Sequence, residues 1–224
     1  MLEIPLLSLV IWIPIIGGLA VLAISRMGDD MVRWLAFGVS MITFLLSLPL
    51  FMGFDNGTYQ MQFAEHASWI PRFNINYDLG VDGISMPLII LTTFTSVLVI
   101  IAGWESIKKH VAQYMAAFLI MEGMMNGVLS SLDAVLFYVF WEGMLIPMFL
   151  IIGIWGGPNR VYAAIKFFLY TFLGSVLLLV GIIFLFFQSG SFSILDFHDL
   201  PISLTAQVLL FLGFLVAFAV KVPM

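Results

Sequence analysis

The sequence predicts an all-α protein that crosses a membrane several times. Of its 224 residues, 62% are hydrophobic and only 9% are charged, and the mean hydropathy is +1.15. A soluble domain of this size has too little interior to bury that much apolar surface. Apolar runs of about 20 residues, long enough to cross a hydrocarbon layer about 30 Å thick, recur between short polar segments. We therefore predict a single membrane domain over residues 1–224.

The apolar runs predict about seven transmembrane helices. The first run has no basic residues before it and is too long for a cleaved signal peptide, so it counts as a span. The last carries Lys221 and runs to Met224. The predicted spans cover residues 4–24, 31–54, 84–104, 114–132, 134–156, 161–187 and 204–224.

Two longer polar loops separate these spans, at residues 55–82 and 188–203. Within the first loop, apolar residues alternate with polar or small ones from Phe73 to Val81, which predicts a half-buried strand or hairpin. Asp82 stands just before the third span and is a candidate helix N-cap.

The basic residues predict the orientation in the membrane. Loops that follow even-numbered spans hold only Arg72, whereas those that follow odd-numbered spans hold six basic residues. These six are Arg26, Arg33, Lys108, Lys109, Arg160 and Lys166. Because positive charge gathers on the cytoplasmic side, we expect the N-terminus and both long loops to lie outside.

Glu142 is the first candidate functional residue. It lies about ten residues into the fifth span, roughly 14 Å deep at 1.5 Å per residue and close to the middle of the bilayer. An ionisable group at that depth costs on the order of 3 kcal/mol. Pro147 cannot donate a hydrogen bond to the carbonyl of Gly143, so a backbone acceptor is freed beside the acid. The pattern indicates a proton or ion path.

Lys221 is the second candidate, in the last span. Pro223 removes the helical hydrogen bond to the Ala219 carbonyl and disfavours helical dihedrals at Val222. We therefore expect the last helix to be broken at Lys221–Pro223. Helices broken at membrane depth line wet cavities or ion sites in transporters.

Together, Glu142 and Lys221 are predicted to act as an acid–base pair in proton translocation. Burial disfavours the charged form of each group and pairing favours it. A conformational change that separates the pair could thus release a proton. In the alternative, a purely structural scaffold, Lys221→Ala would leave transport intact.

Two further ionisable residues are weaker candidates for the same path. Glu122 lies in the fourth span with Asn126 one turn on, and a tight turn at Ser131–Leu132 should place it at the depth of Glu142. Two acids at one level cannot both ionise cheaply, so one of the two is expected to hold a proton. In the alternative, Glu122 is only a hydrogen-bonded packing residue. Lys166, one turn into the sixth span, either supports the path or extends its amine to the interface.

Several kinds of site are absent from the sequence. It has no cysteine, which excludes thiolate-bound iron–sulfur clusters, cysteine zinc sites and disulfides. It has no glycine-rich phosphate loop between a strand and a helix, and nothing in it indicates a nucleic-acid partner. The three histidines, His66, His110 and His198, fall outside the apolar runs and are expected on the surface. Any redox or nucleotide chemistry must therefore belong to other chains.

Five stretches together resemble a known family. They are VDGISMPL at 81–88, FYVFWEGMLIPM at 137–148, IGIWGG at 152–157, KFFLYT at 166–171 and AFAVKVPM at 217–224. They resemble the subunit M (chain 4) family of proton-pumping NADH–quinone oxidoreductase, respiratory complex I. The likeness covers essentially the whole chain, and the wider family includes the large subunits of multisubunit sodium/proton antiporters.

The resemblance implies a fold and site residues. Family members have about fourteen transmembrane helices in two inverted repeats of five, each with a broken helix, so this chain is expected to be an N-terminal fragment with a partial antiporter-like fold. The essential glutamate of the family's fifth helix falls on Glu142, and the lysine of its broken helix falls on Lys221. A lysine at the start of its sixth helix falls on Lys166, with a supporting role at best. The resemblance gives no role for Glu122.

The resemblance also implies a function. The chain is expected to be a proton-translocating membrane-arm subunit in a multi-pass arrangement in the bacterial cytoplasmic (inner) membrane. NADH, FMN, iron–sulfur clusters and quinone are implied on partner subunits, with no cofactor on this chain. The implied partners are the other membrane-arm subunits, especially the neighbouring antiporter-like subunits, and the lipid bilayer. The alternative is the large subunit of a multisubunit sodium/proton antiporter.

Overall fold

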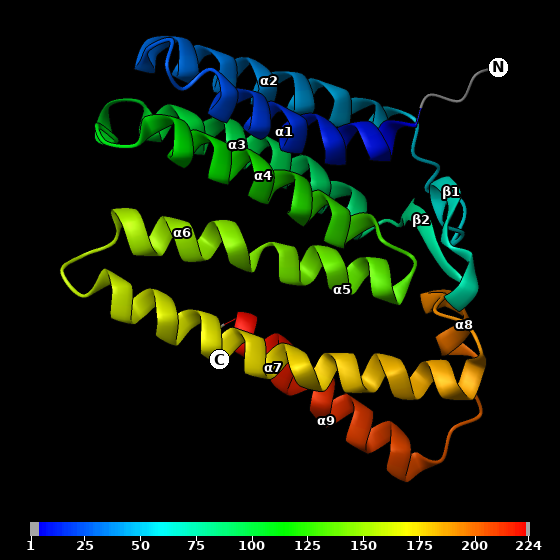
Figure 1. The fold of residues 1–224 in the computed structure, drawn as a ribbon. Coiled ribbons are helices and arrows are strands. Elements are labelled where there is room, and N and C mark those ends of the chain that lie inside the picture. The colour runs from blue at the N-terminus through cyan, green and yellow to red at the C-terminus, as the bar shows by residue number, and fades with distance from the viewer. Residues whose placement is uncertain (1–4, 223–224) are drawn as a thin grey trace. The chain divides into compact units, whose positions relative to one another are not determined.

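The computed structural model describes residues 5–222 and is built almost entirely of helices (Figure 1). Helix accounts for 74% of the described residues, as the composition predicts. The chain divides into two compact units rather than packing as one. The described residues up to His66 form unit 1 together with Asp78–Ser131, and unit 2 combines Ala67–Tyr77 with the residues from Leu132 onward.

Unit 1 is built on four helices. They are α1 (Leu6–Ala23), α2 (Asp29–Met52), α3 (Ser85–Ser106) and α4 (Val111–Ser130). Helix α1 packs against α2 and α4, and α3 packs against α2 and α4. Their buried core is aliphatic and includes Val21, Val32, Ile100, Met115 and Leu119.

Close approach of α1 to α4 depends on glycine. A Cβ atom on Gly123 would lie 2.5 Å from the Ile11 carbonyl oxygen, and one on Gly18 would lie 3.0 Å from the Ala116 carbonyl oxygen. Small residues let membrane helices approach until backbone meets backbone. A hydrogen bond of 3.1 Å from Asn126 Nδ2 to the Val10 carbonyl joins the same two helices.

The long loop after α2 forms a hairpin, as predicted. Strand β1 (Gln62–Ile70) pairs with β2 (Ile75–Val81) through a 3-10 turn (Pro71–Phe73). In β2, Ile75, Leu79 and Val81 are buried, but Tyr77 is only half-buried and Gly80 is buried too, so the strand forms where predicted without strict alternation of burial. Phe73 departs from the pattern: it lies in the turn and is 56% exposed, since Asn74 takes a left-handed conformation there with φ of 52°.

An acid of the hairpin caps the start of α1. The Glu65 carboxylate accepts hydrogen bonds from the backbone N–H groups of Leu7 (2.8 Å) and Ser8 (3.2 Å) and from the Ser8 hydroxyl. The first N–H groups of a helix have no partner within the helix, and their partial positive charge favours an anion. Within the hairpin, the His66 ring on β1 contacts the Asp78 carboxylate on β2.

Unit 2 contains the remaining helices. They are α5 (Ala134–Gly143), α6 (Leu145–Trp155), α7 (Arg160–Ser189), the short α8 (Ile194–His198) and α9 (Leu204–Lys221). Helix α7 is central, because α5, α6 and α9 all pack against it. The predicted fifth span is thus split at Met144, three residues before Pro147, which has no N–H to continue the helical ladder. Helix α8 lies inside the second polar loop and has no counterpart in the sequence-based expectations.

Six of the predicted spans coincide with helices that are long and apolar enough to cross a membrane. Within residues 5–222 these are α1, α2, α3, α5 with α6, α7 and α9. Helix α4 has 20 residues but is less apolar, because it carries Gln113, Tyr114, Glu122 and Asn126. The number of seven spans and the outward N-terminus stay predictions.

At the start of α5, the Asp133 carboxylate accepts hydrogen bonds from two segments of unit 2. Its Oδ1 accepts from the N–H groups of Val135 (2.9 Å) and Leu136 (3.0 Å), which caps α5, and its Oδ2 accepts from the N–H of Asn76 (3.1 Å) at the hairpin tip. Asp133 also pairs with Ser193, just before α8, as an isolated β-bridge. The buried Asp133 side chain therefore joins the start of α5 to the hairpin tip, and the backbone at Asp133 pairs with the segment before α8.

Asp133→Ala is expected to destabilise the protein by about 2–4 kcal/mol, the sum of a lost helix cap and an unsatisfied buried N–H. Asp133→Asn, which keeps one acceptor oxygen, should lose less. The apparent thermal midpoint in detergent measures both changes. The control is Asp196→Ala at the exposed acid of α8, and equal midpoints for Asp133→Ala and this control would contradict the prediction.

Asp82 caps α3, as predicted, with the helix beginning at Ser85. Its Oδ1 accepts from the N–H groups of Ser85 (2.7 Å) and Ile84 (3.0 Å). The hydrogen bond from the Ser85 backbone holds the pKa of Asp82 below its ordinary value of 3.8, against a smaller opposing effect of partial burial. Since the folded-state pKa is depressed, ionised Asp82 stabilises the fold above pH 3.8 and this contribution is lost as the pH falls through the lowered pKa.

Asp82→Asn should flatten the acid side of the stability profile, because an asparagine oxygen still caps the helix but does not titrate. The measurement is the apparent thermal midpoint as the pH is lowered from neutral to below the ordinary pKa of 3.8. Asp196→Asn serves as the control and should retain the acid loss of the unmodified protein. An unchanged acid loss in Asp82→Asn would refute the assignment.

Candidate functional site

The last described helix ends at the predicted lysine. Helix α9 has Lys221 as its final residue, and Val222 leaves the helical region with φ of −95° and ψ of 95°. The helix therefore ends at the position predicted for the break, and its continuation beyond that position stays a prediction. Pro223, on which the prediction relied, lies outside the described residues.

The Lys221 ammonium contacts α5 through Trp141. Its Nζ donates a 3.1 Å hydrogen bond to the Trp141 carbonyl and lies 4.5 Å from the centroid of the Trp141 ring. An ammonium over an indole face is attracted by the negative face of the ring. The backbone carbonyl and the indole ring of Trp141 therefore both hold the Lys221 amine in place.

Trp141 is itself fixed by its neighbours. Its indole Nε1–H donates to the Ser175 hydroxyl on α7 over 3.3 Å, and the Ser175 hydroxyl in turn donates to the Thr171 carbonyl. Phe218 of α9 meets the indole edge to face at 5.3 Å, and Phe137 stacks on it at 5.6 Å. Trp141 thereby links α5, α7 and α9 at the position of the lysine.

Glu142 follows Trp141 directly, at the end of α5. It is half-buried, and its Oε1 atom is fully enclosed without a hydrogen-bond partner among residues 5–222. The carboxylate interacts electrostatically with Lys221, but in the described part of the chain no direct ion pair joins them. The structure thus brings acid and amine together as neighbours, with the amine bonded to a backbone carbonyl.

Two glycines of α7 position α9. A Cβ atom on Gly181 would lie 2.3 Å from the Phe214 ring, and one on Gly174 would lie 3.1 Å from Val220. Val220 immediately precedes Lys221, so this close packing fixes the end of α9 against α7.

Of the other two candidates, Lys166 lies in unit 2 and Glu122 in unit 1. Lys166 is exposed on α7, with its Nζ 5.9 Å from the centroid of the Tyr162 ring. Within residues 5–222 no hydrogen bond or ion pair joins it to Glu142 or Lys221. Glu122 lies in α4 of unit 1 and is buried. Its predicted common depth with Glu142 stays a prediction.

Sequence reasoning missed Trp141 and Ser175 as contributors to the site. Trp141 stands next to the acid, which is a signal that could have been used. Ser175 gives none, because one hydroxyl in an apolar helix is ordinarily satisfied by its own backbone. Only the packing of α5 on α7 reveals it.

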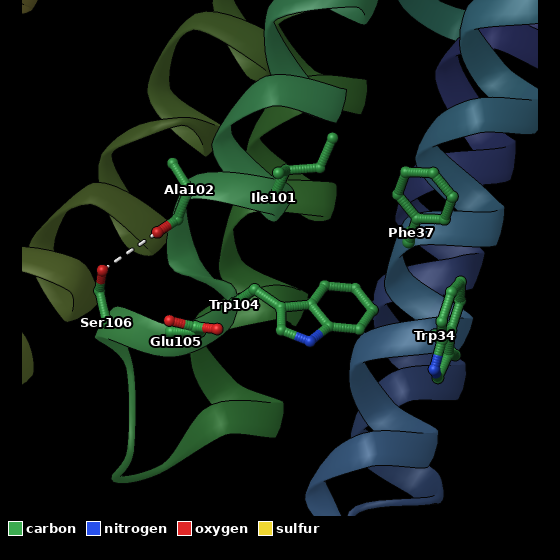
Figure 2. Close-up of a pocket in the computed structure, with 7 residues that line it drawn as sticks. All are labelled: Trp34, Phe37, Ile101, Ala102, Trp104, Glu105 and Ser106. Atoms are coloured by element: carbon green, nitrogen blue, oxygen red, sulfur yellow. Dashed lines mark hydrogen bonds between the residues drawn. The ribbon is translucent and has the colours of Figure 1, made fainter.

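An aromatic pocket at the ends of α2 and α3 was also missed. It has a volume of about 640 Å³ and includes Trp34, Phe37, Trp104 and Glu105 in its lining. Figure 2 shows these side chains, with the Trp34 and Trp104 rings edge to face at 5.1 Å. Indole rings at helix ends are typical of the membrane–water interface, so the pocket marks where unit 1 meets that boundary.

Two protein-family models match adjoining parts of the chain. The model described as "NADH-ubiquinone oxidoreductase chain 4, amino terminus" matches residues 9–131, and the one described as "NADH:quinone oxidoreductase/Mrp antiporter, TM" matches residues 131–224. The chain belongs to the subunit M (chain 4) family of NADH–quinone oxidoreductase.

Curated relatives of this subunit M family carry the same description. The chain is 46% identical to NADH-quinone oxidoreductase subunit M of Rhodobacter capsulatus, over 98% of this chain and 46% of that protein. It is 43% identical to NADH-ubiquinone oxidoreductase chain 4 of Marchantia polymorpha, over 97% of this chain and 44% of that protein. The chain therefore spans about half the length of the curated relatives it matches.

Solved structures share the fold of this subunit M family member. A chain of respiratory complex I from Thermus thermophilus with bound NADH aligns with a TM-score of 0.83 at 27% identity, over 97% of this chain and 44% of that one. A chain of the Mrp complex from Dietzia aligns with a TM-score of 0.81 at 17% identity, over 96% of this chain and 23% of that one. The second likeness shows the fold alone.

Gly181→Ala is expected to displace α9, because the added methyl group meets the Phe214 ring, and to destabilise the protein by about 1–3 kcal/mol. Thermal unfolding in detergent measures the effect. The matched control is Gly213→Ala on α9, where the nearest atom lies 3.9 Å from the added Cβ, and a Gly181→Ala protein equal to this control would contradict the packing argument.

Proposed function

We propose that this chain is part of a proton-translocating membrane-arm subunit of NADH–quinone oxidoreductase and that Glu142 and Lys221 carry the proton. The observation that supports this most is the position of the Lys221 ammonium, bonded to the carbonyl of the residue before Glu142. The split helix α5 with α6 and the end of α9 supply these groups. Interrupted helices are how transporters present ionisable and backbone groups to an ion.

The contact with the Trp141 carbonyl suits an amine that gains and loses a proton. A carbonyl accepts a hydrogen bond from an ammonium or from a neutral amine alike, so the nitrogen keeps its place in both states. The charge of Glu142 stabilises the ammonium more as the two approach. A small movement of α9 between the Glu142 carboxylate and the Trp141 carbonyl therefore alternates proton binding with proton release.

In this proposal the redox chemistry belongs to partner subunits. This chain has no cysteine and so offers no thiolate for an iron–sulfur cluster. NADH, FMN, iron–sulfur clusters and quinone would be bound by other subunits, while this one lies among the neighbouring antiporter-like subunits of the membrane arm, in the bacterial cytoplasmic membrane. Lys166 would have a supporting role at best, because its amine lies apart from Glu142 and Lys221.

The second candidate function is sodium/proton exchange in a multisubunit antiporter. It is favoured by the family model over residues 131–224, whose description names both kinds of protein. The curated relatives, which are oxidoreductase subunits, favour the first function. Proton movement driven by NADH in sodium-free medium distinguishes the two, because an exchanger needs sodium.

Glu142→Gln should reduce NADH-driven proton uptake by at least about 100-fold, the smaller end of what a positioned proton-transfer group contributes. The assay uses membrane vesicles that carry the protein in its native assembly. Lys221→Ala should have the same effect, and Lys221→Arg should not restore transport, because arginine does not give up its proton.

Asp196→Asn is the control, since this exposed acid of α8 lies outside the proposed path, and it should pump normally. Undiminished pumping by Glu142→Gln in vesicles with normal amounts of assembled protein would remove the acid from the mechanism. Equal pumping by Lys221→Ala would favour the scaffold alternative.

A further inference from the structure

We propose that unit 1 contains a second proton-binding site, in which Glu122 exchanges a proton with water in the pocket between α3 and α4. The site goes beyond the proposed function, because it uses neither Glu142 nor Lys221. It rests on a cavity, on unpartnered oxygen atoms of the described residues that line or adjoin it, and on the absence of a basic side chain facing Glu122 from the described helices of unit 1.

The pocket gives water access to the buried acid. Its volume is about 250 Å³, and its lining includes Glu122, Thr92, Thr95 and Ser96. This is room for several water molecules at about 30 Å³ each. Glu122 is 1% exposed, whereas Leu91 at the pocket margin is 57% exposed, so the cavity extends from the acid to the surface of unit 1.

The polar atoms of the pocket are arranged to accept hydrogen bonds. Both carboxylate oxygens of Glu122 are buried without a hydrogen-bond donor among residues 5–222. The Thr92 hydroxyl donates to the Leu88 carbonyl over 2.8 Å, and the Ser96 hydroxyl donates to the Thr92 carbonyl over 3.0 Å. Because the Thr92 and Ser96 hydroxyl protons are used on backbone carbonyls, these two oxygen atoms can only accept hydrogen bonds from a molecule in the cavity.

Rearrangement of the side chains does not remove this excess of acceptors. Ser96 lies close enough to Glu122 to interact with it, and turning its hydroxyl would satisfy one carboxylate oxygen at the cost of the bond to Thr92. One turn along α4, the Asn126 Oδ1 atom is also buried without a partner in the described part of the chain, while Nδ2 is used on the Val10 carbonyl. Buried acceptors need donors, and a proton on Glu122 supplies one.

No basic side chain faces Glu122 from the packed helices. Helix α1 has no ionisable side chain, and the only basic residue of α2, α3 and α4 is Arg33. Arg33 is already bonded to Asp30 (3.1 Å) and to the Ile107 carbonyl (3.2 Å). The other ionisable side chains of these helices are Asp29, Asp30, Glu105 and Tyr114, and none of them is cationic. A buried carboxylate with no counter-charge is costly, so a proton neutralises it.

The proposed exchange is a simple transfer. The O–H bond of the Glu122 carboxylic acid breaks, its proton goes to a pocket water to give hydronium, and the bonding pair stays on the carboxylate. The reverse step reloads the acid. The site therefore stores and releases one proton on the α3–α4 side of unit 1.

Infrared difference spectroscopy on the protein in its native assembly tests the proposal. The unmodified protein should show the carbonyl stretch of a protonated carboxylic acid that is missing in Glu122→Gln and that shifts when H₂O is exchanged for D₂O. Thr95→Leu, which fills the pocket, should keep the band but slow the D₂O shift. Glu142→Gln should leave it unchanged, so this proposal and the proposed function fail independently.

Three results would overturn the site. Spectra of the unmodified protein and Glu122→Gln that match in this region would mean that the acid is ionised and paired by another subunit. A band that disappears when sodium chloride replaces choline chloride would mean that the pocket takes a metal cation. A band that does not respond to D₂O would mean that Glu122 is sealed from water. If Glu122→Gln fails to assemble, the comparison of Thr95→Leu with the unmodified protein decides. A slower D₂O shift in Thr95→Leu supports the site, and an equal rate contradicts it.

Discussion

The hydrogen bond from the Lys221 ammonium to the Trp141 carbonyl, 3.1 Å long, is the contact on which the proposed chemistry depends. In a bilayer, polar groups must find partners within the protein. An amine at the end of one helix and a carbonyl at an irregular point of another are each costly alone. Placed together, they hold α9 and α5 at the same point of unit 2, with Glu142 next to them.

At the starts of three helices, acidic side chains provide hydrogen-bond partners for backbone N–H groups. Glu65 caps α1, Asp82 caps α3 and Asp133 caps α5. Each carboxylate meets N–H groups that have no partner within their helix. The carboxylates of the three capping acids are therefore already hydrogen-bonded to helix N–H groups. Glu122 and Glu142, in contrast, have buried oxygen atoms without partners among the described residues. This contrast separates architectural acids from candidate functional ones.

Features that depend on local chemistry could be predicted from the sequence. Apolar length predicted the spans, alternation in the sequence predicted β2, and proline chemistry predicted the end of α9 at Lys221. The cap at Asp82 also follows from neighbouring residues alone. In each case the cause and the effect lie within a few residues of each other.

Features that depend on distant partners could not. Asp133 bonds Asn76, which is far away in the sequence, and Ser175 reaches Trp141 only because α5 packs on α7. Lys221 was predicted beside Glu142, yet its hydrogen bond goes to a backbone oxygen, and backbone oxygens are the same at every position. That the described helices of unit 1 turn no basic side chain toward Glu122 likewise becomes visible only when the neighbours of α4 in that unit are known.

The length of α7 has a consequence for how unit 2 meets lipid. Its 30 residues amount to about 45 Å at 1.5 Å per residue, against a hydrocarbon thickness of about 30 Å. A helix this much longer than the apolar layer must tilt or project from it. Because Gly174 and Gly181 bring α9 into close contact with α7, any change in the tilt of α7 with bilayer thickness would also move the end of α9 that carries Lys221.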